Sequence, residues 1–160
     1  MRRSYRYTVD LKGQLFLQGQ ARPYRDPAFL DFFFSRVERI DAQAPSSQGY
    51  AWQSRCGREM NFIAPADTPI VFKSLVDASA SPMLLLFAGT LTEPFDPAHL
   101  RVRSATGRLY YLAQTSKAAS VGACLLSSTV ALELSKHIAV NNDDGGRLVY
   151  DAMPIPELAP

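Results

Sequence analysis

The chain has 160 residues, of which 47% are hydrophobic and 20% charged, so it is long enough and apolar enough to fold around a core. This composition excludes intrinsic disorder, and the longest purely apolar run, Met83–Ala88, is far shorter than the roughly 20 residues of a membrane-spanning helix. The formal net charge of +2 is too small to predict a nucleic-acid or membrane partner.

The few cysteines and histidines limit the chemistry that the chain can support. Cys56 and Cys124 are too few for the disulfide framework of a small secreted domain. Together with His99 and His137 they show no zinc-ligand spacing. The basic N-terminus shows no signal-peptide pattern. We therefore expect an intracellular protein, cytoplasmic or mitochondrial, that does not associate with membranes.

The first quarter of the chain predicts a β-hairpin followed by a helix. Tyr5–Asp10 and Gln14–Leu17 have strand-like residues, and Gly13 between them is typical of a turn with positive φ. Asp26-Pro27 places a good N-cap residue before a proline, which is favoured in the first helical position. Apolar residues at helical spacing then predict a helix over Pro27–Ile40.

The middle of the chain predicts short strands separated by turns. Asp41–Gly49 is rich in turn-forming residues and is predicted as a loop, and Pro94–His99 as a turn or one short helical turn. Met83–Phe87 is apolar throughout, which indicates a buried central strand. The other predicted strands are Tyr50–Arg55, Glu59–Ile63, Pro69–Val76, Gly107–Ala113 and Arg147–Tyr150.

The C-terminal third contains one ambiguous segment. Ser127–His137 has apolar residues at helical spacing, but part of it also alternates as a strand would. We favour the helix, because a serine at the start can cap it. Asn141–Gly146 is predicted as a turn, and the Pro-rich end, Met153–Pro160, as an extended tail.

Strand pairs close in sequence, with few helices between them, predict an α+β fold. We expect a mainly antiparallel sheet built from hairpins, with one or two helices covering it. Residues 1–152 are expected to form a single domain, and residues 153–160 a C-terminal tail.

The motifs of the commonest catalytic folds are missing from the sequence. It has no GxxxxGK[ST] or GxGxxG phosphate loop, no HExxH pair, no GxSxG elbow and no EF-hand loop. The one adjacent pair of carboxylates, Asp143-Asp144, precedes a glycine and is typical of an exposed turn. We therefore assign no catalytic residue, no metal ligand and no cofactor from the sequence.

The densest polar cluster is Arg55–Asn61. Arg58 can bind a carboxylate or phosphate through its planar guanidinium, with Asn61 assisting, and the cationic neighbours of Cys56 favour its thiolate. Cys56, Arg58, Glu59 and Asn61 are therefore the predicted binding residues. The alternative is a simple hairpin corner, in which Cys56 packs as a small apolar residue and Arg58 pairs with Glu59.

Aromatic residues interleaved with arginines raise the alternative of RNA binding. Tyrosines on an exposed sheet face, rimmed by arginines, can stack single-stranded bases. However, alternation along a strand places Tyr5 and Tyr7 on the face opposite to Arg6. Tyr110 and Tyr111, beside Arg108, fit ordinary packing on a half-buried strand equally well.

Several segments together resemble a known family. They are Tyr5–Asp10 leading into Gly13–Leu17, Arg25–Leu30 with Phe33–Arg36, Cys56–Phe62 followed by Pro69–Phe72, Gly107–Tyr110, and Ala131–Ser135. Their order and spacing are similar to those of uncharacterised protein family UPF 0598, a eukaryotic domain of unknown function. The resemblance covers Tyr5–Ser135 and implies no activity, cofactor or catalytic residue.

Three classes of function remain open at this point. The leading hypothesis is a soluble, non-catalytic binding or accessory protein, whose partner is a protein or a small anion bound at Arg58 and Asn61. The first alternative is an enzyme with a pocket around Cys56–Asn61, and the second is an RNA-binding module. A homo-oligomer that uses the Phe29–Phe34 face is also compatible with the sequence.

Overall fold

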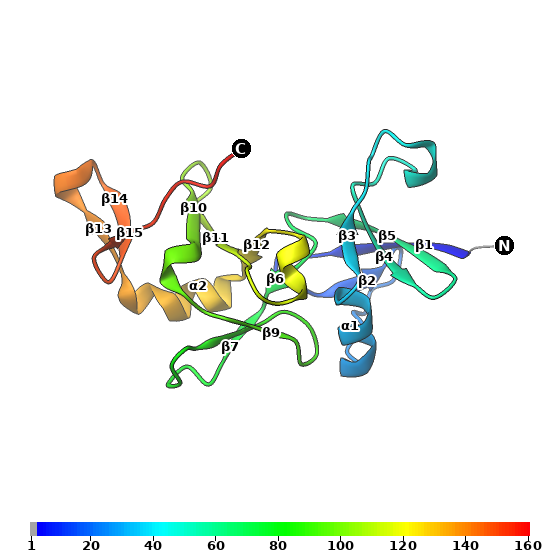
Figure 1. Cartoon of the computed structure of the whole chain (residues 1–160), viewed down its shortest axis with the longest axis horizontal. Coiled ribbons are helices and arrows are strands. Elements are labelled where there is room, and N and C mark those ends of the chain that lie inside the picture. Colours follow the sequence, from blue (N-terminus) through cyan, green and yellow to red (C-terminus); the bar gives the residue numbers. More distant parts are fainter. Residues whose placement is uncertain (1–2) are drawn as a thin grey trace.

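Residues 3–160, which the computed structural model describes, form four β-sheets and two short α-helices (Figure 1). This is an α+β fold, as the sequence predicts. Within this range no helix is both long and apolar enough to cross a membrane.

The first sheet contains the N-terminal strands in the order β2-β1-β5-β4-β3. Strands β1 and β2 pair antiparallel around the turn at Gly13, and β4 and β5 pair antiparallel around the turn at Gly57. Strands β1 and β5 are parallel neighbours, a pairing that requires a long crossover and that no local sequence signal predicts. The bounds are β1 Arg3–Val9, β2 Leu15–Leu17, β3 Val37–Arg39, β4 Trp52–Cys56 and β5 Glu59–Pro65.

Helix α1 (Pro27–Phe34) covers one face of this sheet. It begins as predicted, because the Asp26 carboxylate accepts a hydrogen bond from the N–H of Phe29 at its first turn. The prediction that the helix continues to Ile40 is wrong. β3 follows instead and pairs with β4, since β-branched Val37, only 3% exposed, reaches the core as well from a strand as from a helix.

Two further sheets form the centre of the molecule (Figure 1). The predicted strand Pro69–Val76 is split at Lys73 into β6 and β7, which belong to different sheets. The predicted strand Met83–Phe87 contains β8, which is the central strand of its sheet. One sheet has the order β10-β11-β12-β6, and the other β7-β8-β9. The bounds are β6 Val71–Phe72, β7 Ser74–Val76, β8 Leu84–Leu86, β9 Thr92–Pro94, β10 Leu100–Arg103, β11 Arg108–Leu112 and β12 Ala123–Leu126.

The C-terminal part resolves the ambiguous segment as a helix. Helix α2 (Ser128–Leu134) is capped by the Ser127 hydroxyl, which accepts a hydrogen bond from the N–H of Val130. The fourth sheet follows, with β13 (Ile138–Asn141), β14 (Arg147–Tyr150) and β15 (Met153–Pro154) in that order. Five short 3₁₀ turns complete the described residues: Pro45–Ser47, Pro97–His99, Lys117–Ser120, Ser135–His137 and Asn142–Asp144.

The end of the chain is extended and lies against the second sheet. The Ile155 side chain is only 2% exposed. The N–H of Leu158 donates to the Val102 carbonyl at 2.7 Å, and the N–H of Val102 donates to the Pro156 carbonyl at 3.0 Å. The division into residues 1–152 and a tail of 153–160 stays a prediction.

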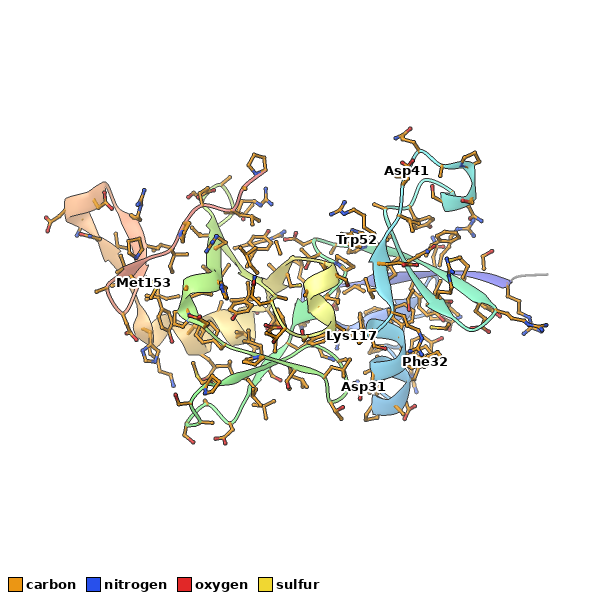
Figure 2. All side chains as sticks on the ribbon, in the orientation of Figure 1. Asp31, Phe32, Asp41, Trp52, Lys117 and Met153 are labelled. Carbon is orange, nitrogen blue, oxygen red and sulfur yellow. The ribbon has the colours of Figure 1, made fainter. Side chains whose placement is uncertain are left out.

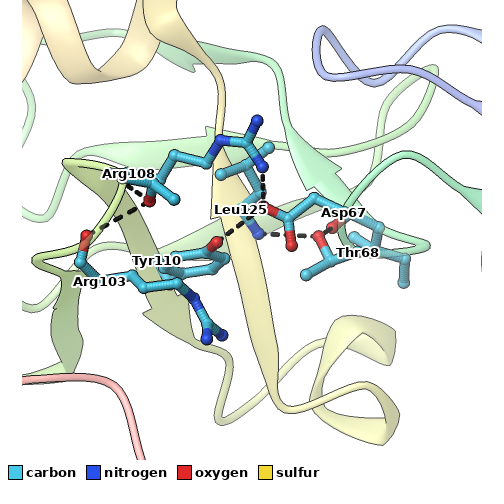
Figure 3. Close-up of polar contacts among 8 residues, drawn as sticks. Asp67, Thr68, Arg103, Arg108, Tyr110 and Leu125 are labelled. Atoms are coloured by element: carbon cyan, nitrogen blue, oxygen red, sulfur yellow. Dashed lines mark hydrogen bonds and ion pairs between the residues drawn. The ribbon is translucent and has the colours of Figure 1, made fainter.

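Partly buried polar side chains join the first sheet to the second (Figure 3). Just after β5, the Asp67 carboxylate accepts hydrogen bonds from Arg108 Nη1 at 3.0 Å and from the Tyr110 hydroxyl at 2.7 Å. The adjacent Thr68 hydroxyl accepts the N–H of Leu125 at 2.9 Å and donates to the Ile70 carbonyl at 2.7 Å. The crossover between the sheets is therefore fixed by side chains rather than by strand pairing alone.

A buried carboxylate joins the third sheet to the loop after β11. Glu93 is 1% exposed and accepts the N–H groups of Gln114, Thr115 and Ser116 at 3.1, 3.3 and 3.0 Å. Burial alone would raise its pKa, but the hydrogen bonds outweigh burial, and the pKa of Glu93 lies below its ordinary value. The charge is thus held by the backbone of the loop.

Glu93→Gln tests how much the Glu93 carboxylate stabilises the contact between the third sheet and the loop after β11. The amide keeps the shape but is a weaker acceptor, so we expect the free energy of unfolding at pH 7 to fall by about 2–3 kcal/mol. Because folding lowers this pKa, the stabilisation is present above the ordinary value of 4.5 and is lost as the pH falls below it. Urea unfolding between neutral and acidic pH should show a steeper acid loss in the wild type. An equal change in Glu133→Gln, an exposed control on α2, would contradict the prediction.

Thr68→Val tests the hydrogen bond that the Thr68 hydroxyl accepts from Leu125 on β12. Valine is nearly isosteric but leaves the N–H of buried Leu125 without its acceptor, so we expect a loss of about 1–3 kcal/mol of unfolding free energy. Thr129→Val, at an exposed position of α2, is the matched control and should change stability by well under about 1 kcal/mol. Wild-type stability of the Thr68 variant in urea unfolding would show that the hydroxyl is dispensable.

Candidate functional site

The polar cluster predicted from the sequence lies at the turn between β4 and β5. Cys56 ends β4 and Glu59 begins β5, and they pair directly across the two strands. Asn61 pairs in the same way with Ser54, so Cys56, Glu59 and Asn61 share one face of the sheet. Arg58 lies in the turn and is exposed. The structure therefore brings three of the four predicted residues together and leaves Arg58 apart.

The shared face is the one under α1, where Ser54 and Asn61 are buried and Cys56 and Glu59 are partly buried. The Ser54 hydroxyl donates to the Phe33 carbonyl at 2.6 Å, and Cys56 Sγ lies 3.6 Å from that hydroxyl. The Asn61 side chain is 2% exposed, and its Oδ1 accepts no hydrogen bond from residues 3–160. An unpaired buried oxygen of this kind is costly.

Tyr7 approaches the same cluster from β1. Burial, followed by the proximity of Tyr24, Glu59 and Cys56, raises the pKa of Tyr7 far above its ordinary value, so its hydroxyl stays protonated. Five surface cavities lie elsewhere on the described part of the chain, and Cys56, Glu59 and Asn61 line none of the five.

A basic cavity of about 390 Å³ lies between the β1–β2 turn and the N-terminal end of α1. Its size is within the range of small-molecule sites. Three of its lining side chains, Lys12, Arg25 and Lys73, are cationic, and none of the described lining residues is acidic. The other lining residues are Gly13, Gln14, Leu15, Pro23, Tyr24, Pro27, Leu30, Ala88 and Gly89.

Lys73 reaches the cavity from the junction between β6 and β7. Its N–H donates to the Leu86 carbonyl at 2.8 Å, and its carbonyl accepts the Ser127 hydroxyl at 3.0 Å. Its alkyl chain lies over Gly13, where an added Cβ would stand 2.6 Å from Lys73 Cγ. Gly13 also has a φ of +82°, which glycine adopts without strain. The tight turn and the position of the lysine therefore depend on each other.

The ammonium group of Lys73 forms no ion pair with the residues that the structure describes. The side chain is half-buried, and burial lowers the pKa of its ammonium group, an effect that the charge of Asp31 only partly offsets. Among residues 3–160, no carboxylate forms an ion pair with Lys73. A half-buried cation beside an open cavity can be neutralised by an anion from solution.

Arg25 and Lys12 extend the positive charge to the rim of the cavity. Both are exposed, and within residues 3–160 neither forms an ion pair. Arg25 also lines a neighbouring cavity of about 360 Å³ together with Arg22 and Pro23. Guanidinium groups bind carboxylate and phosphate through two parallel hydrogen bonds. The site can therefore accept a group with one or two negative charges.

The wall near Ala88 and Gly89 is tied to α1. Asp31 lies on α1 (Figure 2), and its carboxylate accepts the N–H of Thr90 at 2.8 Å as well as the Thr90 hydroxyl. Burial opposes ionisation, but these hydrogen bonds lower the pKa of Asp31 below its ordinary value. Gly89 packs so closely on Pro27 that any side chain would collide with that backbone. The spacing between helix and loop is thereby fixed.

Sequence reasoning missed this basic cavity. Lys12 falls in a predicted turn and Lys73 in the middle of a predicted strand, so nothing local connects them. The available signal was the pair Arg22 and Arg25 ahead of the helix cap, two cations without an acid between them. Only the tertiary contact of Gly13 with Lys73 brings the groups to one place.

Three of the four tyrosines considered for RNA stacking are buried, and Tyr5 is partly buried. Tyr110 and Tyr111 are each 1% exposed, and Tyr7 is 6% exposed. Their rings pack in the core, where Tyr111 contacts Phe72 and Phe95. These three rings are not available for stacking with bases.

The fold and the cavity together define an α+β domain with a basic, small-molecule-sized pocket. The chain belongs to the family described as a domain of unknown function, DUF4505, whose family model matches residues 1–151. The expectation of an uncharacterised family is confirmed. The name UPF 0598 and a eukaryotic origin stay predictions.

Two solved structures are similar in fold. A DUF1285 family protein from Silicibacter pomeroyi DSS-3 has a TM-score of 0.56 and 15% identity, over 99% of this chain and 83% of its own. A DUF1285 family protein from Shewanella baltica OS155 has a TM-score of 0.52 and 12% identity, over 81% of this chain and 90% of its own. At such identities the likeness shows the fold alone.

Lys73→Met tests whether the unpaired charge of Lys73 lowers the free energy of unfolding. A lysine pKa that folding lowers means that the charged form destabilises the native state at neutral pH. Methionine keeps most of the alkyl chain, so we expect the variant to gain roughly 0.5–1 kcal/mol of unfolding free energy. Lys117→Met, at an exposed lysine (Figure 2), should show no gain. A less stable Lys73 variant would contradict the prediction.

Proposed function

We propose that the protein is a non-catalytic binding module for a small molecule that carries a phosphate or carboxylate group, held in the basic cavity. The observation that carries this proposal is Lys73, a half-buried cation that lines a cavity and has no ion pair within residues 3–160. Ligand binding would supply the missing negative charge, so the destabilisation of the empty site would be recovered on binding.

The chemistry of the lining supports binding rather than catalysis. The described lining residues include no carboxylate, imidazole or thiol, the groups that most often act as general bases or nucleophiles. They offer two ammonium groups, one guanidinium, the Gln14 amide and the Tyr24 hydroxyl, beside apolar side chains. This combination favours orientation of an anion over its reaction.

The turn between β4 and β5 is a second predicted binding position. The buried, unpaired Asn61 Oδ1 is the observation in its favour, because a donor from a partner could satisfy it. Cys56, Arg58 and Glu59 complete that prediction. An enzyme site there, a protein partner, a homo-oligomer and an intracellular location likewise stay predictions.

A thermal-shift panel tests the proposed function. Phosphate, sugar phosphates, nucleotides and dicarboxylates would each be added to the purified full chain at increasing concentration. A ligand at about 100 times its dissociation constant should stabilise the protein by roughly 2.7 kcal/mol. We expect one anionic class to produce this shift in the wild type, and Lys73→Met and Arg25→Gln to abolish or weaken it.

Arg58→Ala separates the two binding positions. Because Arg58 lies outside the basic cavity, this variant should keep the wild-type response. A response lost in Arg58→Ala but kept in Lys73→Met would transfer the proposal to the β4–β5 turn. A flat panel for every anion would refute small-anion binding and leave a protein partner as the hypothesis to pursue by affinity capture.

A further inference from the structure

A second cavity, of about 410 Å³, adjoins the basic one and has a different character. It lies between the β1–β2 turn, strands β11 and β12, and the first turn of α2. Five of its ten lining residues have aliphatic side chains. The lining residues are Leu11, Lys12, Thr106, Gly107, Arg108, Leu109, Leu125, Leu126, Ser128 and Ala131.

The two cavities share Lys12, which lines both. They also meet at one piece of backbone, because the Ser127 hydroxyl donates to the Lys73 carbonyl at 3.0 Å. Ser127 stands between two residues that line the apolar cavity, and Lys73 lines the basic one. The turn Leu11–Gly13 is thus the divider between an apolar and a cationic compartment.

The charges around the apolar cavity are unequal. Arg108 is neutralised by Asp67, whose carboxylate lies 3.0 Å from its guanidinium. Lys12 forms no ion pair among residues 3–160. No acidic residue lines either cavity within the described chain. Lys12 is therefore the unneutralised cation of the apolar cavity, and it lies where this cavity meets the basic cavity.

The floor and the rim of the apolar cavity also differ. Leu125 and Leu126 are 3% exposed and Leu109 is 8% exposed, so they form a closed floor. Leu11, at the divider, is 41% exposed. Covering the exposed Leu11 side chain beside this apolar floor is favourable, because it removes apolar area from water.

We propose that the two cavities form one site for an amphipathic anion, with the acidic head group at Lys73, Arg25 and Lys12 and an aliphatic tail over Leu11 in the apolar cavity. This inference rests on the anion-binding function and adds the class of ligand. Lys12 suits the junction, because its alkyl chain can lie along the tail while its ammonium group contacts the head. The occupant is a single molecule, since each cavity has the volume of a small-molecule site.

Calorimetric titration with a series of alkyl phosphates tests the inference. Methyl, butyl and octyl phosphate carry the same head group, and all would be used below their critical micelle concentrations. Each buried methylene should raise affinity roughly fourfold, so butyl phosphate should bind at least about tenfold more tightly than methyl phosphate. The gain should continue towards octyl phosphate until the cavity is filled. Acetate and octanoate form a parallel pair for a carboxylate head.

Variants of the apolar cavity isolate the tail. Ala131→Phe fills the cavity from α2, and Leu11→Gln removes an exposed aliphatic wall without disturbing the core. Both should remove most of the advantage of the longer chains, while methyl phosphate affinity stays within about twofold of the wild type. Val140→Gln is the matched control, because it removes an aliphatic side chain that is 55% exposed on β13. It should change neither the affinity for methyl phosphate nor the gain in affinity with chain length.

The possible outcomes separate this inference from the function on which it rests. Equal affinities across the series, for phosphates and carboxylates alike, would overturn the amphipathic ligand and leave the anion site standing. No binding of any member would overturn both. If octyl phosphate fails to bind below its critical micelle concentration and binds only in a separate titration above it, the result would indicate a lipid surface and also overturn the single-molecule site. A chain-length gain that persists unchanged in both cavity variants would place the tail elsewhere.

Discussion

The close contact between Gly13 and Lys73 is the constraint on which the centre of the molecule depends. Gly13 belongs to the turn of the first sheet, whereas Lys73 connects a strand of the second sheet to a strand of the third. The lysine chain can pass over the turn only because residue 13 has no Cβ. Three sheets thereby meet at one point, and both cavities open beside it.

Three polar side chains that connect the sheets have internal hydrogen-bond partners. Asp67 and Glu93 are held by side-chain and backbone donors, and Thr68 both donates and accepts. These contacts connect sheets that each have few strands. Lys73 forms no ion pair within residues 3–160, and Asn61 Oδ1 and His99 Nδ1 are buried there without a hydrogen-bond partner.

Local signals in the sequence predicted many of the elements, since their causes are local. The cap at Asp26, the turn at Gly13 and the serine cap of α2 each act within a few residues. The helix that was predicted to reach Ile40 shows the limit of this reasoning. A buried Val37 is compatible with the apolar spacing of a helix and with that of a strand. Pairing with β4, which lies fifteen or more residues from Val37 in the sequence, decided between the two.

The sequence by itself determined an α+β fold with short strands, and it contains none of the common catalytic motifs. It also pointed to anion binding through arginine-rich segments, but at the β4–β5 turn. Tertiary structure alone decided which cations share a cavity, because Lys12, Arg25 and Lys73 are separated by long stretches of chain. The parallel pairing of β1 with β5 and the packing of Lys73 on Gly13 are contacts at long range, and no periodicity within one segment encodes them.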